Sequence, residues 1–242
     1  MYAVKCENLT KKYKGVTALD NCSLEVDEGA LFGLLGVNGA GKTTLIKILC
    51  GLTPPTGGDA YVFDKSVKTQ MSEIKSLVDV SPQETSVAGK LTVEENLKFF
   101  AEIYYRDKGE RERAVQSVVE TFSLDEVLSR RAGKLSGGWQ RRLSIAAALV
   151  SNPKVLFLDE PTLGLDVLAR RELWNVIRKV KGKTTIILTS HYLEEIEALC
   201  DKVTILNRGR VAAQGTVEEI KSGADEKSFE DAFVKIVTGE RV

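Results

Sequence analysis

A glycine-rich loop at residues 36–43, Gly-Val-Asn-Gly-Ala-Gly-Lys-Thr, carries the most informative chemistry of this chain. It lies between a short apolar run and a predicted helix, the context of a phosphate-binding P-loop. Successive backbone N–H groups can point at phosphate oxygens there, and the helix start adds partial positive charge. Lys42 is placed to reach the β- and γ-phosphates, and Thr43 to put its hydroxyl on Mg²⁺. The loop predicts a nucleoside triphosphate site with further contacts from Asn38, Gly39, Ala40, Gly41 and Thr44.

A pair of acids ends a second apolar run, Val155-Leu156-Phe157-Leu158-Asp159-Glu160. A buried strand with carboxylates at its C-terminal tip is where an open α/β sheet places its ligands. Asp159 suits an acid that holds Mg²⁺, and Glu160 suits a general base that polarises the attacking water. The alternative is that the two acids only begin a solvated turn, and this stretch alone does not decide between the two interpretations.

The string Leu135-Ser136-Gly137-Gly138-Trp139-Gln140 precedes another predicted helix. Its serine and two glycines form a second phosphate-binding helix start, this time without a lysine. An ordinary N-cap at Ser136 beside a glycine loop is the alternative. In the order P-loop, this string and the Asp-Glu strand, the sequence resembles the ATP-binding cassette (ABC) family, whose signature at this location is similar to Leu-Ser-Gly-Gly-Gln.

The resemblance extends over nearly the whole chain and implies roles for further residues, with ATP and Mg²⁺ as cofactors. Gln83 looks like the glutamine that touches Mg²⁺ and the attacking water. His191 looks like the switch histidine on the γ-phosphate, and Asp166 like the residue that reaches across a dimer. Tyr13 stands where the family stacks an aromatic ring on adenine, although a tyrosine that only packs on the first sheet is the alternative. The signature residues implied to contact nucleotide are Ser136, Gly137 and Gly138.

Two residues depart from the family pattern. Val37 stands where proline is usual, and Trp139 replaces the usual glutamine or methionine. Neither position carries a catalytic role, so the ATPase interpretation is unaffected. The bulk of Trp139 is expected to act on the interface or on coupling to a partner.

The elements that must hold these residues follow from the apolar pattern. Short apolar runs predict buried strands at 31–35, 155–158, 185–188 and 203–206. Amphipathic stretches predict helices at 42–50, 168–180 and 192–199. Such alternation indicates a parallel sheet with helices on both faces. Together with the resemblance it predicts an α/β fold, a RecA-like P-loop NTPase core with an N-terminal antiparallel β-subdomain and an inserted α-helical subdomain.

The middle third of the chain is predicted to be helical, with helices at 111–122 and 139–151. Another begins near Leu91, where Thr92 and Glu95 form a capping box. Its predicted core face is Val93, Leu97, Phe100, Ala101 and Tyr104. Phe99 and Tyr105 point elsewhere and are expected to anchor a partner, with packing against the next helix as the alternative.

We expect residues 1–242 to form one nucleotide-binding domain. Residues 84–152 are the inserted helical subdomain that carries the signature, and residues 223–242 are a short helical tail. A capping box at Thr216 and Glu219 and a turn at 207–209 mark the approach to this tail.

Charge and hydropathy restrict the partners. Lys and Arg total 34, as do Asp and Glu, so the sequence lacks the basic excess that would predict a nucleic-acid partner. The longest apolar runs are far shorter than the ~20 residues that cross a bilayer. A path across the membrane must therefore come from a separate permease. The resemblance implies a cytoplasmic subunit that the permease holds at the inner face of the cell membrane, paired with a second ABC subunit.

A transport ATPase explains every motif. A soluble, non-transport member of the family would be expected to carry two cassettes or a long coiled-coil insertion, and neither is evident here. A small-molecule kinase would leave the Leu-Ser-Gly-Gly string and the lone His191 unexplained. Within transporters, the segments 31–36 and 228–236 are similar to those of multidrug and antibiotic exporters, so export is the expected direction.

Overall fold

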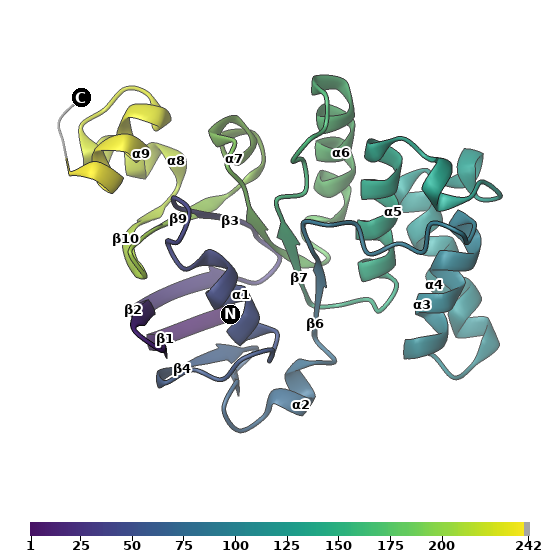
Figure 1. Ribbon diagram of the computed structural model, residues 1–242, viewed down its shortest axis with the longest axis horizontal. Helices are drawn as coiled ribbons and strands as arrows, with labels where there is room; N and C mark the ends of the chain where they lie inside the picture. Colours follow the sequence, from purple (N-terminus) through teal and green to yellow (C-terminus); the bar gives the residue numbers. More distant parts are fainter. Residues whose placement is uncertain (240–242) are drawn as a thin grey trace.

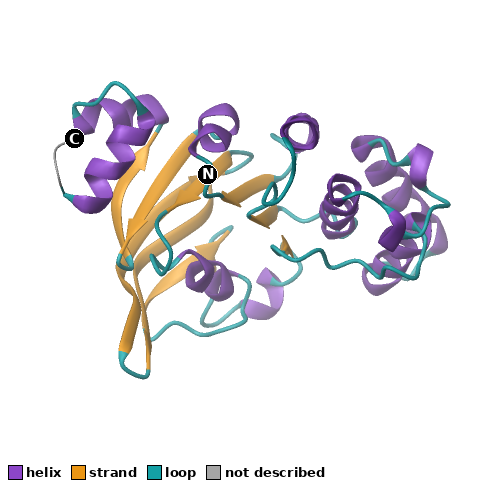
Figure 2. Cartoon of the chain, turned by 45° about the horizontal axis from the view of Figure 1, so that its top comes forward, coloured by secondary structure: helices purple, strands orange, loops and turns teal. Residues whose placement is uncertain are grey.

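A six-stranded sheet in the order β10-β9-β3-β8-β7-β6 lies at the centre of the computed structural model, which describes residues 1–239 (Figures 1 and 2). All neighbours in it pair in parallel except β10, which is antiparallel to β9. The strands are β3 (Leu31–Leu35), β6 (Val78–Ser81), β7 (Val155–Asp159), β8 (Thr185–Thr189), β9 (Lys202–Asn207) and β10 (Arg210–Gly215). The predicted parallel core is confirmed.

Side chains of the parallel strands alternate between two hydrophobic cores. The helices that flank the sheet are α1 (Lys42–Leu49), α6 (Val167–Val180) and α7 (Leu193–Leu199). In β3, Leu31 and Leu35 share a core with α6 and α7, whereas Phe32 and Leu34 share the other core with α1. This is the period of two expected for a strand. Burial of both faces explains why β3 is a continuous apolar run.

An antiparallel sheet in the order β2-β1-β4-β5 shares the second core with α1. Its strands are β1 (Tyr2–Tyr13), β2 (Val16–Asp27), β4 (Gly57–Val62) and β5 (Lys65–Ser66). It is the N-terminal antiparallel β-subdomain that the resemblance implied. A single helical turn, α2 (Met71–Ile74), leads from this sheet to β6.

Three helices and two 3₁₀ turns form a lobe at one end of the molecule, beyond β6 and β7 (Figure 1). They are α3 (Val93–Tyr104), α4 (Lys108–Phe122), η1 (Asp125–Val127), η2 (Ala132–Lys134) and α5 (Gly137–Leu149). The predicted capping box of α3 is confirmed: Glu95 N–H donates to Thr92 Oγ1 (3.2 Å), and Thr92 N–H donates to the Glu95 carboxylate (2.7 Å). Helix α4 begins earlier than predicted because Asp107 caps it, accepting from Glu110 N–H at 2.9 Å.

Tyr104 and Tyr105, at the end of α3, have each other's predicted roles. Phe99 is 54% exposed, as predicted, but Tyr104 is also exposed, at 46%. Tyr105 instead packs against the core and donates its hydroxyl to the Val150 carbonyl at 3.0 Å. The buried stripe continues in steps of four residues through Leu97 and Ala101, and this register selects Tyr105. The assignments of Tyr104 to the core and of Tyr105 to a partner surface were wrong.

The chain ends in two helices, α8 (Val217–Ala224) and α9 (Phe229–Thr238). The predicted capping box of α8 is confirmed, with 3.1 Å from Glu219 N–H to Thr216 Oγ1. Phe229 and Ala232 fix α9 to the core. Residues 240–242 of the predicted tail lie outside the described part of the chain. No helix within residues 1–239 combines the length and apolar character needed to cross a membrane.

The edge strand β6 was not predicted, because polar residues interrupt its short apolar run. Asp79 and Ser81 face the helical lobe, while Val78 and Val80 pack in the core that contains α1. Asp79 Oδ2 accepts hydrogen bonds from the hydroxyls of Tyr104 and Ser151, both at 3.0 Å. The Ser81 hydroxyl lies 3.2 Å from that of Ser144 on α5. These contacts join the lobe to the strand that leads to Gln83.

Asp79→Asn is expected to reduce the pH dependence of stability. Burial raises the pKa of Asp79 above its ordinary value of 3.8, although hydrogen bonds to Val80, Ser151 and Tyr104 oppose the shift. The folded chain therefore holds this proton more tightly than the unfolded chain. The contribution of Asp79 to stability consequently falls as pH rises through the interval above 3.8.

An amide does not titrate, so the stability of Asp79→Asn relative to the wild type should be greater at pH 7 than at pH 4. Urea unfolding at the two pH values measures this difference. Glu126→Gln, at an exposed position, is the control for replacing a carboxylate by an amide. A relative stability of Asp79→Asn that is the same at both pH values would contradict the expectation.

Candidate functional site

The predicted P-loop leaves the C-terminal end of β3 and turns into α1. Gly41, which precedes the helix, has a φ of 110°, and a Cβ there would lie 2.6 Å from the Ala18 carbonyl oxygen. Only glycine fits this position. The β9–β10 turn supports the loop from behind, since Gly209 N–H donates to the Ala40 carbonyl at 3.0 Å. The loop is therefore shaped by its surroundings as well as by its own sequence.

The side chain of Lys42 lies within the curl of the loop. Its Nζ donates to the carbonyls of Gly36 at 2.6 Å and Val37 at 3.4 Å. Burial lowers the pKa of Lys42, and the carboxylates of Glu160 and Asp159 oppose that shift. A largely buried ammonium group is thus held close to the backbone that would surround phosphates, opposite two acids.

A cleft of about 590 Å³ opens in front of the P-loop. It brings together twelve residues that the sequence analysis had assigned to the site, from five separate segments of the chain. These residues are Tyr13, Asn38, Gly39, Ala40, Gly41, Lys42, Thr43, Thr44, Gln83, Asp159, Glu160 and His191. Val16 and Ala18 of β2 complete its lining.

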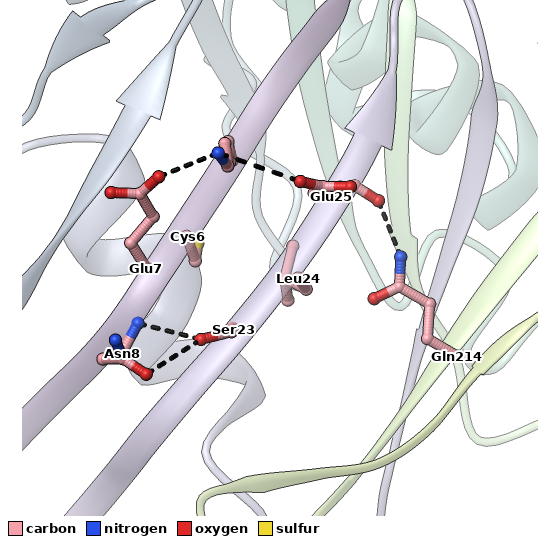
Figure 3. Close-up of a pocket in the computed structure, with 8 residues that line it drawn as sticks. Cys6, Glu7, Asn8, Ser23, Leu24, Glu25 and Gln214 are labelled. Atoms are coloured by element: carbon pink, nitrogen blue, oxygen red, sulfur yellow. Dashed lines mark hydrogen bonds and ion pairs between the residues drawn. The ribbon is translucent and has the colours of Figure 1, made fainter.

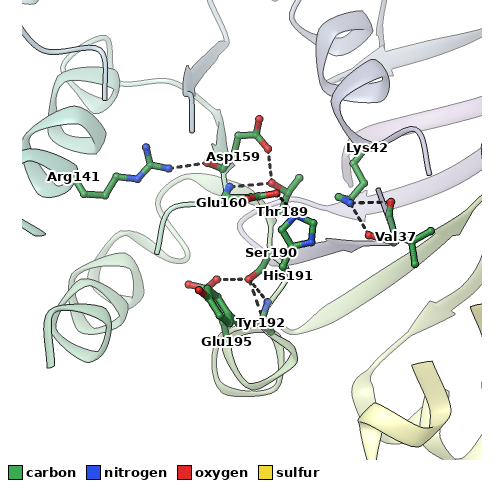
Figure 4. Close-up of polar contacts among 11 residues, drawn as sticks. Val37, Lys42, Arg141, Asp159, Glu160, Thr189, Ser190, His191, Tyr192 and Glu195 are labelled. Atoms are coloured by element: carbon green, nitrogen blue, oxygen red, sulfur yellow. Dashed lines mark hydrogen bonds and ion pairs between the residues drawn. The ribbon is translucent and has the colours of Figure 1, made fainter. Parts of the chain in front are cut away.

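The two acids occupy the end of β7, beside the end of β8 (Figure 4). Thr189 pairs with Asp159 across the parallel strands and donates its hydroxyl to Asp159 Oδ1 at 2.6 Å. The same hydroxyl accepts the Glu160 N–H at 3.0 Å. Glu160 has a φ of 49°, so the chain turns sharply there and directs consecutive carboxylates to different places. One threonine thus orients both acids.

His191 lies on the loop that follows β8, next to Glu160. Its Nε2 is 2.5 Å from Glu160 Oε1, and the side chains of His191 and Glu160 are 40% and 13% exposed. A carboxylate held by an imidazole, with one face open to the cleft, can accept a proton from a water molecule. The pair, together with Lys42, has the composition of a hydrolytic centre for a phosphate anhydride.

Arg141 is a site residue that the sequence analysis missed. It lies on α5, is only 4% exposed, and donates to four backbone carbonyls. The acceptors are those of Asp159 (2.7 Å), Pro161 (2.8 Å), Gln83 (3.2 Å) and Pro82. Burial lowers the pKa of Arg141 to about 10, opposed first by Asp159. One guanidinium group therefore connects the helical lobe, the Gln83 loop and the acid pair.

A signal for Arg141 did exist in the sequence. It falls on the same helical stripe as the buried residues Ser144, Ile145 and Ala148. A charged residue on an otherwise buried stripe indicates a structural partner.

The signature residues and Asp166 do not line the cleft. Ser136 and Gly137 are exposed at the start of α5, and the Ser136 side chain makes no capping hydrogen bond. Asp166 caps α6, where its Oδ1 accepts from Leu168 N–H and Ala169 N–H, both at 2.9 Å. Within one chain these residues therefore belong to a different surface from the P-loop.

Tyr13 stands at the mouth of the cleft, at the end of β1. Its ring is 45% exposed, and Lys11 Nζ lies 4.9 Å from the ring centroid. Lys11 is itself held by the Pro54 carbonyl at 2.6 Å. The cation and the strand hold the ring at the cleft edge, which suits a stacking surface for a base.

A second groove, of about 610 Å³, lies on the antiparallel sheet (Figure 3). Its charged side chains pair with each other, as Lys5 does with Glu7 at 2.8 Å. Asn8 N–H donates to Ser23 Oγ at 2.9 Å, and Gln214 donates to the Glu25 carbonyl at 2.8 Å. Because the charged side chains of the groove are engaged with each other, we assign it no chemistry.

Residues 19–163, more than half of the chain, match the ABC transporter family. The chain is 40% identical over 222 residues to the daunorubicin/doxorubicin resistance ATP-binding protein DrrA of Streptomyces peucetius, covering 91% of this chain and 67% of that protein. It is 37% identical over 241 residues to the probable multidrug ABC transporter ATP-binding protein YbhF of Escherichia coli, covering 97% of this chain and 41% of that protein. The chain thus spans less than half the length of YbhF.

Among solved structures, the ATP-binding cassette MJ0796, a dimer in a post-hydrolysis state with ADP and phosphate, superposes with a TM-score of 0.77. It is 25% identical, and the match covers 88% of this chain and 98% of that one. The P-loop, the acid pair and His191 meet in one cleft on the same fold. The chain therefore belongs to the ABC transporter family, as one of its ATP-binding, ATP-hydrolysing cassettes.

Proposed function

We propose that this ATPase drives export through a separate membrane permease and hydrolyses ATP between two facing cassettes. The observation that carries the proposal is the division of the phosphate-binding groups between two surfaces. The cleft holds the P-loop and the acids, whereas the Ser136-Gly137-Gly138 helix start lies outside it. A helix start with free N–H groups is an anion site, so a second cassette can supply it to the first.

In the proposed hydrolysis, Glu160 accepts the proton of the attacking water. His191 Nε2, 2.5 Å from Glu160 Oε1, holds that carboxylate in place and faces the γ-phosphate position. Lys42 offsets the charge of the β- and γ-phosphates. Tyr13 stacks on the adenine, and Asn38, Gly39, Ala40, Gly41 and Thr44 supply the loop that surrounds the phosphates.

Oxygen atoms of Thr43, Gln83 and Asp159 suit Mg²⁺, which prefers hydroxyl, amide and carboxylate ligands. The Thr189 hydroxyl donates a hydrogen bond to Asp159 Oδ1, so the second carboxylate oxygen of Asp159 is available to the ion. Residues 1–239 contain no cluster of three His, Cys, Asp or Glu side chains that could hold a metal, and a nucleotide-bound Mg²⁺ needs none. When bound, the ion would neutralise charge that develops on the phosphate oxygens.

The surface around Asp166 supports pairing. Leu163, Val167 and Leu168 are 43%, 62% and 74% exposed. Their neighbours Leu165 and Ala169 lie beside Gly137 and Gly138 of the signature. Apolar side chains gathered in this way favour a protein interface. The MJ0796 cassette was solved as a dimer, which supports the same arrangement here, with Asp166 reaching the partner. The second cassette would be another copy of this chain or a relative.

The proposed permease contact is on α3. Phe99, Ile103 and Tyr104 are 54%, 62% and 46% exposed, and Phe99 packs edge to face on Phe100 with ring centroids 5.7 Å apart. Helix α3 lies in the helical lobe together with α4 and α5 (Figure 1). We place the subunit on the inner face of the cell membrane through this contact. The names of DrrA and YbhF, which refer to daunorubicin resistance and to multidrug transport, support export of small molecules.

Glu160→Gln is expected to lower the turnover number by about 10²–10⁴, the usual cost of removing a general base. ATP binding should survive, so the variant should be monomeric without nucleotide and dimeric with Mg-ATP on a sizing column. Adding Ser136→Arg should abolish the dimer by placing bulk and charge where the γ-phosphate docks. An equally strong dimer from the double variant would exclude the shared site.

Lys42→Ala and His191→Ala should separate binding from hydrolysis. Lys42→Ala loses a charge-assisted phosphate contact, so nucleotide affinity should fall about 10- to 100-fold. His191→Ala should retain affinity and lose hydrolysis, because its proposed contacts are with Glu160 and the γ-phosphate. Titration with a fluorescent ATP analogue, beside a phosphate-release assay, makes the comparison. An equal loss of affinity in both variants would contradict this division.

Phe99→Ala should weaken copurification with the permease while leaving the melting temperature and basal hydrolysis unchanged. Tyr105→Phe is the matched control, because it removes a hydrogen bond within the lobe and leaves the exposed patch intact. It should cost about 1 kcal/mol of stability and copurify normally. Full copurification of Phe99→Ala would rule out this surface.

A further inference from the structure

Glu195 is the only acidic side chain that lies fully inside the core of the described residues. It lies on α7 and is 0% exposed. Burial raises the pKa of its carboxyl group, and hydrogen bonds to Ser190, Trp174 and Thr162 oppose the shift. A buried carboxylate is costly unless it is fully hydrogen-bonded. None of the roles proposed above for the cleft residues involves Glu195.

The carboxylate of Glu195 is contacted by three separate segments. Its Oε2 accepts from the hydroxyls of Ser190 at 2.6 Å and Thr162 at 3.1 Å. Its Oε1 accepts from the indole N–H of Trp174 on α6 at 2.9 Å. Figure 4 shows the contact between Glu195 and Ser190. Ser190 precedes His191, and Thr162 comes two residues after Glu160, so a single oxygen atom joins the two loops that carry the catalytic pair.

The bond to Ser190 fixes the backbone around His191. The Ser190 hydroxyl accepts Tyr192 N–H at 3.0 Å while it donates to Glu195. Both groups that flank His191 are therefore oriented by this hydroxyl. Without the carboxylate acceptor, the Ser190 hydroxyl can rotate away. The turn that positions the His191 imidazole then loses a hydrogen bond that constrains it.

The bond to Thr162 fixes the turn after Glu160 in the same way. Thr162 is 0% exposed, and Leu165 N–H donates to its carbonyl at 3.1 Å. In the same turn, Leu163 N–H donates to the carbonyl of Glu160 at 3.2 Å. The short segment 160–162 thus connects Glu160 to Glu195, because Thr162 donates its hydroxyl to the Glu195 carboxylate.

Arg170 supplies positive charge near Glu195, and this charge opposes the rise in the pKa of Glu195 that burial causes. Its guanidinium carbon lies 4.1 Å from the ring centroid of Tyr192, and its buried Nε has no hydrogen-bond partner. This cation and the three hydrogen bonds compensate in part for the burial of the carboxylate.

We infer that Glu195 is a positioning residue for ATP hydrolysis: its carboxylate holds the loop before His191 and the turn after Glu160 together, so that the 2.5 Å contact between His191 and Glu160 is kept. This inference rests on the proposed roles of His191 and Glu160. It assigns Glu195 no contact with nucleotide or water.

Glutamine at this position is the informative substitution because it keeps the volume. Its single carbonyl oxygen cannot accept from both the hydroxyl pair and the Trp174 N–H. The indole N–H can only donate, whereas the two hydroxyls can also accept, so the amide oxygen should face Trp174. In that orientation the hydroxyls of Ser190 and Thr162 lose their shared acceptor.

The experiment measures ATP hydrolysis and melting temperature for the purified full chain. Glu195→Gln should lower kcat between about 10- and 100-fold, the range expected when a catalytic group is displaced by about 1 Å. KM for ATP should stay within about twofold, since the P-loop is untouched. Trp174→Phe is the matched control, because it removes only the contact to Oε1, and its kcat should stay within about twofold of the wild type.

A double-mutant cycle separates positioning from a merely structural role. In the His191→Ala background, Glu195→Gln should cause little further loss of kcat, because there is no imidazole left to position. A wild-type kcat for Glu195→Gln, or an equal fractional loss in both backgrounds, would overturn the inference. His191→Ala with a wild-type kcat would instead refute the proposed function, so the two failures are distinguishable.

Thr162→Val serves as the second variant if Glu195→Gln fails to fold. It removes one hydroxyl at nearly constant volume and should lower kcat several-fold with KM unchanged, and the loss should again vanish in the His191→Ala background. A wild-type kcat for Thr162→Val would overturn the inference.

Discussion

Register between parallel strands decides where the chemistry of this cassette lies. Thr189, the last residue of β8, pairs with Leu34 of β3 on one side and with Asp159 of β7 on the other. The loops that leave these strands must therefore emerge side by side at one edge of the sheet. A slip of two residues between β8 and β7 would displace the loops that carry His191 and Glu160 by about 6.6 Å relative to each other. No side-chain adjustment restores the 2.5 Å contact between His191 and Glu160 after such a shift.

Buried charge is the second constraint, and it acts collectively. Burial lowers the pKa of both Lys42 and Arg141, and nearby carboxylates oppose the shift in each case. Each of these cations is held by backbone carbonyls of the chain itself. An arrangement of fixed charges in a partly dry cleft stabilises developing phosphate charge without reorganisation. Removal of any one of these charged side chains would leave the buried charge of its neighbours poorly compensated.

The helical lobe is connected to this site by directional contacts in addition to its hydrophobic core. Arg141, one turn into the signature helix, binds the carbonyls of Gln83 and Asp159. Asp79, on the strand that leads to Gln83, binds hydroxyls from α3 and from the end of α5. A rotation of the lobe relative to the sheet would have to stretch these hydrogen bonds. They form a physical route from the exposed patch on α3 to the acid pair.

The composition of the site could be predicted from the sequence because its motifs are local. A glycine-rich loop before a helix has a meaning that needs no distant partner. The same holds for the strands of the core, whose burial on both faces makes them continuous apolar runs. The acid pair alone left two interpretations open, and its order after the P-loop and the Leu-Ser-Gly-Gly string decided between them. Strand β6 escaped prediction because Asp79 and Ser81 look solvent-exposed until the lobe supplies their hydroxyl partners.

Only the tertiary structure decided which residues connect the motifs. Arg141 binds backbone carbonyls from two distant segments, 82–83 and 159–161, which leave no trace in side-chain identity. Glu195 resembles any acid in the first turn of a helix until Thr162 and Trp174 are brought to it. The sequence by itself therefore determined what chemistry the chain performs. The fold decided how the groups are held, because hydrogen bonds between distant segments depend on positions in space and not on spacing along the chain.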